Sequence, residues 1–152
     1  DILAREGCLV YRPRGVSMEP MLRQNRDLVV IQVPSSRLRK FDVALYKRGE
    51  AYVLHRVIGV AAGHYLIRGD NTYSVETVPD SAVIGVLTSF QRKGIQHDVS
   101  DRSYQLYVYF WDVIYPLRHA CFCLRHFAVR TARKLGILPS LKKMLCARFV
   151  SR

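Results

Sequence analysis

Residues 52–60 read Tyr-Val-Leu-His-Arg-Val-Ile-Gly-Val, an apolar and β-branched run that predicts a long strand. Four similar runs lie on either side of it, at residues 28–33, 42–46, 64–68 and 81–90. Turn-forming residues separate the runs at a spacing of roughly ten residues, which is typical of antiparallel all-β domains. The sequence therefore predicts a mainly β fold.

The period of the apolar residues changes in the last third of the chain. From Leu117 they recur with a helical period, and most Arg and Lys side chains fall on the opposite arc. Pro116 suits the first turn of this helix and Gly136 suits its end. A last basic helix is expected at about residues 140–149.

Charge divides the chain in a similar way. Residues 1–101 hold 14 Lys and Arg against 11 Asp and Glu, whereas residues 102–152 hold 10 against 1. We therefore expect a β-domain at 1–92, a polar linker at 93–101 and basic amphipathic helices at 102–152. Such a basic segment favours an anionic partner, either a membrane surface or nucleic acid.

Ser17 is the first candidate for chemistry, in the sequence Gly-Val-Ser-Met-Glu-Pro at residues 15–20. A nucleophilic serine needs a base within hydrogen-bond reach and donors for the oxyanion. Gly15 leaves room for a peptide backbone, Met18 offers a flexible apolar surface, and Pro20 stiffens the chain. By itself the motif is short, and a serine at such a place can equally cap a helical turn.

Five further short motifs follow Ser17 in order. They are Asp-Leu-Val-Val at 27–30, Phe-Asp-Val-Ala at 41–44, His-Arg-Val-Ile-Gly at 55–59, Arg-Gly-Asp-Asn at 68–71 and Val-Ile-Gly at 83–85. In order and spacing, the six motifs resemble those of the type I signal peptidases. The related self-cleaving LexA-type repressors share part of the set. The resemblance covers residues 15–85, a little under half of the chain.

The resemblance implies a coiled antiparallel β-domain of the signal peptidase/LexA type, with Ser17 as nucleophile at its edge. The base of these enzymes lies on the strand that ends in Arg-Val-Ile-Gly, and in most bacterial members it is a lysine. Here His55 takes that position, which resembles the archaeal, endoplasmic-reticulum and sporulation-associated branch. A neutral imidazole is a competent base near pH 7. Outside this motif, a lone histidine in a strand is usually structural.

A histidine base benefits from a carboxylate that orients it. Asp70 is the first candidate, although an Asp-Asn pair after a glycine is also typical of a tight turn. Glu76 and Asp80 follow closely and remain alternatives.

The resemblance also places Gly15, Met18 and Pro20 in the oxyanion and substrate-binding region, together with the backbone N–H of Ser17. Many relatives carry a serine where this chain has Gly15, so any second oxyanion donor must be a backbone group or come from elsewhere in the chain. Relatives bind the substrate as an added β-strand with small residues at the first and third positions before the cut.

This chemistry requires no cofactor, and none is expected. The four cysteines show neither the spacing of a zinc site nor a disulfide framework, so we expect no metal site and free thiols. They are Cys8, Cys121, Cys123 and Cys146.

Known signal peptidases are anchored in the membrane, usually near the N-terminus. Residues 1–8 contain no apolar run, so no N-terminal signal or anchor is expected. The apolar stretch at 104–117 is short for a membrane span and contains Asp112. Its aromatic residues and the basic charges of 102–152 suit the interface of an anionic membrane.

The alternative is that these helices pack on the β-domain or on a second copy of the chain. Nucleic acid is disfavoured, because no recognisable reading motif accompanies the charge.

The sequence thus predicts a serine endopeptidase of the signal peptidase type that cleaves an exported or precursor peptide. Its expected location is a bacterial or archaeal cell, in the cytoplasm or peripheral to the membrane. One alternative is a LexA-type self-processing regulator, which lacks support because no DNA-binding domain or self-cleavage segment precedes Ser17. The other is a non-catalytic peptide-binding module, which the presence of both Ser17 and His55 disfavours.

Overall fold

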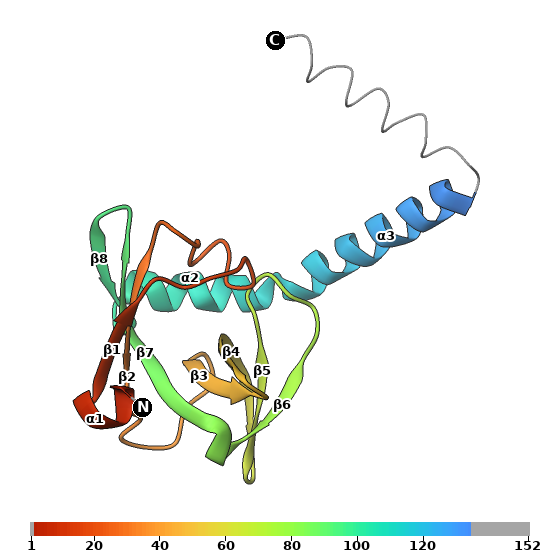
Figure 1. Ribbon diagram of the computed structural model, residues 1–152. Coiled ribbons are helices and arrows are strands. Elements are labelled where there is room, and N and C mark those ends of the chain that lie inside the picture. Colours follow the sequence, from red (N-terminus) through yellow and green to blue (C-terminus); the bar gives the residue numbers. More distant parts are fainter. Residues whose placement is uncertain (1, 135–152) are drawn as a thin grey trace. The chain divides into compact units, whose positions relative to one another are not determined.

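The computed structural model describes residues 2–134, whose strands form one antiparallel, curled sheet followed by two helices (Figure 1). The elements are α1 (Ile2–Glu6), β1 (Cys8–Tyr11), β2 (Leu28–Gln32), β3 (Val43–Arg48), β4 (Ala51–Ala61), β5 (His64–Arg68), β6 (Glu76–Pro79), the 3-10 helix η1 (Asp80–Ala82), β7 (Val83–Arg92), β8 (Ile95–Asp98), α2 (Arg102–Val113) and α3 (Tyr115–Lys134). The predicted mainly β class with C-terminal helices is confirmed.

The strands lie in the order β1-β2-β7-β3-β4-β5-β6, and β8 pairs with β7. The five runs predicted from the sequence correspond to β2, β3, β4, β5 and β7. The short strands β1, β6 and β8 were not predicted. Strand β8 lies within the expected linker and forms a hairpin with β7, because Lys93 and Gly94 both adopt the positive φ angles that a tight hairpin turn requires.

The core occupies both faces of β3, which lies near the middle of the sheet. Val43 and Leu45 belong to one cluster of buried side chains, and Ala44 and Tyr46 belong to a second cluster. Successive side chains of a strand point to opposite faces, so β3 is covered on both of them. Residues 51–56 of strand β4 pair with the whole of β3 and place His55 opposite Ala44.

Helix α2 packs on the sheet through one of its faces. Tyr104 and Val108, one helical turn apart, are buried in the same cluster as Leu45. Leu106, Tyr109 and Phe110 lie exposed elsewhere on the helix. The chain divides into two units, and the first ends at Trp111. The beginning of the expected tail, residues 102–111, therefore belongs to the β-domain, and residues 2–111 are called the β-body below.

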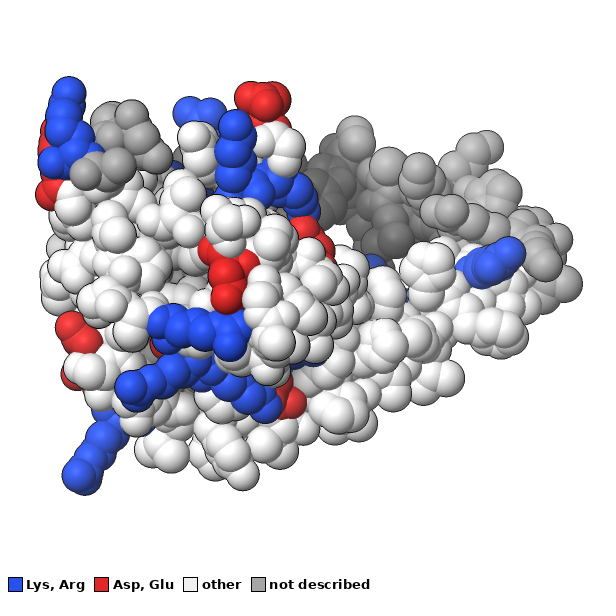
Figure 2. All heavy atoms as spheres, turned by 90° about the horizontal axis from the view of Figure 1, so that it is seen from below, with Lys and Arg blue, Asp and Glu red and all other residues white. Residues whose placement is uncertain are grey.

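Helix α3 confirms the helical period found in the sequence, and Pro116 lies in its first turn as expected. Gly136 and the helix expected at 140–149 lie outside the described residues. Within residues 2–134, no helix combines the length and the apolar character that crossing a membrane requires. On the face of the β-body shown in Figure 2, Lys and Arg side chains lie beside Asp and Glu side chains.

Candidate active site

A cavity of about 560 Å³ lies beside Ser17 and strand β4. Among the residues predicted from the sequence, it brings together Gly15, Ser17, Met18 and His55. Its volume is within the range of small-molecule and peptide-binding clefts. Pro20 and Asp70 do not line it.

Ser17 lies in a turn between β1 and β2 that the core holds in place. Met18 and Leu22 are buried, and the Leu22 N–H donates to the Met18 carbonyl over 2.9 Å. Gly15 has a φ of +88°, a conformation that favours glycine, and no atom lies within 4 Å of the place a Cβ would occupy. The space beside Gly15, which lines the cavity together with Ser17, is therefore open. Pro20, after a cis peptide bond, is half-buried.

A turn at residues 69–72 contacts the backbone of this segment. The Asn71 N–H donates to the Ser17 carbonyl over 2.8 Å, and the Asn71 side chain donates to the Val16 carbonyl over 3.2 Å. A Cβ on Gly69 would lie 2.7 Å from the Ser17 carbonyl oxygen and 3.0 Å from His55 Nε2. Only glycine fits between them, so the serine segment and the histidine ring meet at Gly69.

His55 is buried, with 7% of its side chain exposed. Its Nδ1 lies 3.3 Å from the Tyr46 hydroxyl and 3.6 Å from Glu76 Oε1. The Tyr46 hydroxyl donates to Glu76 Oε2 over 3.0 Å, so its oxygen can accept a proton from Nδ1. We assign the imidazole proton to Nδ1 on this network, which leaves Nε2, on the Gly69 side, as the basic nitrogen.

Burial lowers the pKa of His55 below its ordinary value. The negative charge of Glu76 offsets part of this effect, whereas the positive charge of Arg48 adds to it. The imidazole is therefore neutral at pH 7 and able to accept a proton. Burial and the neighbouring Glu76 raise the pKa of Tyr46, so its hydroxyl stays protonated.

Glu76 is the carboxylate beside His55 Nδ1. It begins β6 and also accepts a hydrogen bond from Arg48 Nη1 over 3.0 Å. Both of its oxygens are thus engaged, one by Arg48 and the other by Tyr46. Asp80, the remaining alternative from the sequence, pairs with Arg37 at 3.3 Å in a partly exposed position.

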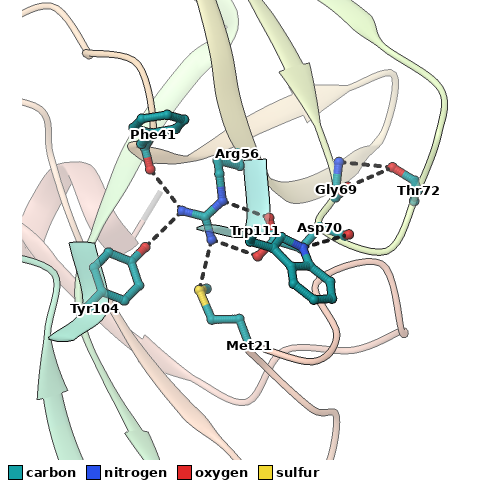
Figure 3. A network of polar contacts seen from close by, with 8 residues as sticks. All are labelled: Met21, Phe41, Arg56, Gly69, Asp70, Thr72, Tyr104 and Trp111. Atoms are coloured by element: carbon teal, nitrogen blue, oxygen red, sulfur yellow. Dashed lines mark hydrogen bonds and ion pairs between the residues drawn. The ribbon is translucent and has the colours of Figure 1, made fainter. Parts of the chain in front are cut away.

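Asp70 lies in a different network (Figure 3). Its side chain is 2% exposed, and its two oxygens each lie 2.7 Å from a nitrogen of Arg56. Arg56 also donates to the Phe41 carbonyl, the Tyr104 hydroxyl and the Met21 sulfur. Both oxygens of Asp70 are thus directed at the guanidinium, and the carboxylate in contact with His55 Nδ1 is that of Glu76.

Sequence reasoning did not single out Tyr46, Arg48 or Gly69. Gly69 has a sequence signal, because it belongs to the Arg-Gly-Asp-Asn motif. No sequence motif marks Tyr46 or Arg48, because both are ordinary residues for the end of a strand.

No known protein family matches this sequence, and no curated protein is significantly similar to it. Within residues 2–134, no group of three or more His, Cys, Asp or Glu side chains is arranged to hold a metal ion. Cys8, Cys121 and Cys123 are free thiols, and Cys146 lies outside the described residues.

Replacing Asp70 by Asn leaves the buried Arg56 guanidinium without its counter-charge. We expect Asp70→Asn to lower the free energy of unfolding by about 3–5 kcal/mol, measured by urea denaturation. The matched control is Asp80→Asn, whose exposed partner Arg37 limits the loss to below about 1 kcal/mol. Equal and small losses in both variants contradict the structural role of the Arg56–Asp70 pair.

Proposed function

We propose that the chain is a serine endopeptidase of the signal peptidase type that cleaves an exported or precursor peptide. The observation that carries the proposal is that Ser17 and a buried, neutral His55 line one cavity. The second nitrogen of that histidine is held by a tyrosine and a carboxylate, as a general base requires. The order of the six sequence motifs supports the same assignment.

The reaction proceeds in two halves. His55 Nε2 takes the hydroxyl proton of Ser17 while Oγ attacks the scissile carbonyl carbon, and the resulting imidazolium protonates the departing amine. The acyl group is then bound to Ser17 as an ester. Water loses a proton to His55 and attacks the ester carbonyl, and His55 returns the proton to Ser17 Oγ as the new carboxyl terminus leaves.

Among the three acids considered from the sequence, we assign the orienting role to Glu76. Its charge stabilises the imidazolium that forms during both halves of the reaction, and Tyr46 connects it to Nδ1. Asp70 acts in this scheme as a structural residue, because the carboxylate beside His55 Nδ1 is that of Glu76, whereas both oxygens of Asp70 bind Arg56.

The backbone N–H of Ser17 is our candidate for the first oxyanion donor. Gly15 offers no side-chain donor, as noted from the sequence. The Thr72 hydroxyl lines the cavity but is engaged within its own turn, where it bonds to both the N–H and the carbonyl of Gly69. The Thr72 hydroxyl could serve as the second oxyanion donor only if that turn opened.

We further propose that the chain meets its substrate at an anionic membrane surface through α3 and the residues after it. Leu117, Leu124 and Phe127 are exposed large apolar side chains of α3, and Arg125 and Arg130 are exposed on the same helix. Leu117 and Leu124 are seven residues apart and therefore share one side of the helix. Exposed apolar side chains beside basic ones are typical of helices that lie in the membrane interface.

Removing the nucleophile or the base tests the peptidase assignment. We expect Ser17→Ala and His55→Ala each to reduce cleavage by about 1000-fold or more. The measurement is mass spectrometry of synthetic precursor peptides with small residues at the first and third positions before the expected cut. Ser74→Ala is the matched control, because Ser74 also lines the cavity. Equal cleavage by wild type and all variants rules out the proposed mechanism.

The pH dependence tests the roles of His55 and Glu76. Because the base acts when neutral and its pKa is lowered, kcat/KM rises with pH along a limb whose midpoint lies below 6.5. Glu76→Gln removes a charge that raises the pKa of His55, so this limb moves to lower pH while kcat falls. Glu50→Gln, at a fully exposed position, leaves both unchanged. A limb that moves to higher pH in Glu76→Gln excludes Glu76 as the partner of His55.

Vesicle flotation tests the membrane proposal. The full chain should float with vesicles that contain phosphatidylglycerol and remain unbound with pure phosphatidylcholine, because residues 102–152 hold 10 Lys and Arg against 1 Asp. Combined Ser substitutions at Leu117, Leu124 and Phe127 should abolish flotation by removing the apolar contact. A Ser substitution at Tyr52, an exposed apolar residue of β4, serves as control. Flotation that is the same for all variants argues against α3 as the contact.

A further inference from the structure

Helix α2 contacts the turn at residues 69–72 through Trp111 and, by way of Arg56, through Tyr104 (Figure 3). The indole N–H of Trp111 donates to the backbone carbonyl of Asp70 over 3.1 Å. Tyr104 accepts a hydrogen bond over 3.0 Å from Arg56, whose guanidinium binds the carboxylate of Asp70. Tyr104 and Trp111 are seven residues apart, so both project from one side of the helix. Asp70 is thus fixed by α2 at its backbone and, through Arg56, at its side chain.

The next residue of the turn reaches the serine segment. Asn71 follows Asp70 directly, and its N–H and side-chain amide donate to the carbonyls of Ser17 and Val16. Gly69, on the other side of Asp70, is in close approach to Ser17 and His55 Nε2. A displacement of the Asp70 peptide groups would therefore be transmitted to the nucleophile and to its base.

We propose that Trp111 is a positioning residue of the site: its indole N–H holds the Asp70 carbonyl and thereby fixes the 69–72 turn against Ser17. The catalytic consequence rests on the proposed peptidase function, whereas the positioning itself does not. A shift of about 1 Å in a reacting group is enough to cost 100-fold in rate, so a contact remote from the chemistry can control it.

Tyr107, which stacks on Trp111, offers a matched comparison for the Trp111 N–H. The rings of Tyr107 and Trp111 stack at a centroid distance of 5.9 Å, and Tyr107 packs against a core cluster of the β-body. The buried hydroxyl of Tyr107, however, has no hydrogen-bond partner among the described residues. Aromatic packing is common to the two residues, and the hydrogen bond to the turn is specific to Trp111.

The test compares Trp111→Phe with Tyr107→Phe, two variants that keep an aromatic ring and lose one polar hydrogen. Amide hydrogen exchange at Asn71, followed by NMR, reports on its bond to the Ser17 carbonyl. We expect Trp111→Phe to accelerate this exchange about three- to tenfold and Tyr107→Phe to leave it unchanged. On peptide substrates, Trp111→Phe should lower kcat about 10- to 100-fold with little change in KM.

The proposal is overturned if Asn71 exchange is the same in Trp111→Phe as in wild type, or if Tyr107→Phe changes it equally. Should Trp111→Phe fail to fold, the wild type provides the measurement, because Trp111 is the only tryptophan and its indole proton gives a single signal. An indole proton that exchanges as fast as that of free tryptophan overturns the proposal, and a protected one supports it. The two proposals can fail separately. Faster Asn71 exchange in Trp111→Phe supports the positioning role, and a wild type without peptidase activity refutes the proposed function.

Discussion

The buried ion pair between Arg56 and Asp70 is the constraint on which the rest of the β-body depends. A guanidinium in a protein core is tolerated only if its charge is paired and its donors are satisfied. Here the partners come from four separate parts of the chain: the 69–72 turn, the loop at Phe41, helix α2 and the segment that follows Ser17. Satisfying one side chain therefore requires all four to converge.

The ion pair also separates Arg56 and Asp70, which stabilise the fold, from His55 and Glu76, which lie at the candidate site. His55 and Arg56 are neighbours on β4, and the alternation of a strand sends their side chains to opposite faces. Arg56 contacts Met21 and Tyr104 of one core cluster, whereas His55 contacts Tyr46 of the other. The carboxylate next to Arg56 is committed to it, and the histidine is left with an acid from a different strand. One dipeptide thus supplies the central charge of the fold and the histidine of the candidate site.

The sequence predicts the parts of this structure that local patterns encode. The longer strands were predicted because β-branched runs mark them, and Ser17 and His55 were found because short motifs surround them. Glu76 was left as an alternative because its position depends on the pairing of β6 with β5, and a four-residue edge strand has too few residues to show a period. Asp70 was ranked first because spacing does not reveal that Arg56 engages both of its oxygens. Likewise, the aromatic residues at 104–111 suit a membrane interface and a protein core equally well, and only their contacts assign Tyr104 to the core.

Because helix α2 follows every strand in the sequence, it affects the stage of protein synthesis at which the site can form. Segments of a nascent protein become available in order, from the N-terminus onward. Ser17 and His55 emerge early, but the helix that braces the 69–72 turn is encoded after every strand of the sheet. If the contact from Trp111 is needed to align them, a chain still attached to the ribosome would hold Ser17 and His55 unaligned until residue 111 has emerged and α2 has docked. If the chain is the peptidase proposed above, it would then become able to hydrolyse a peptide only once the β-body is complete.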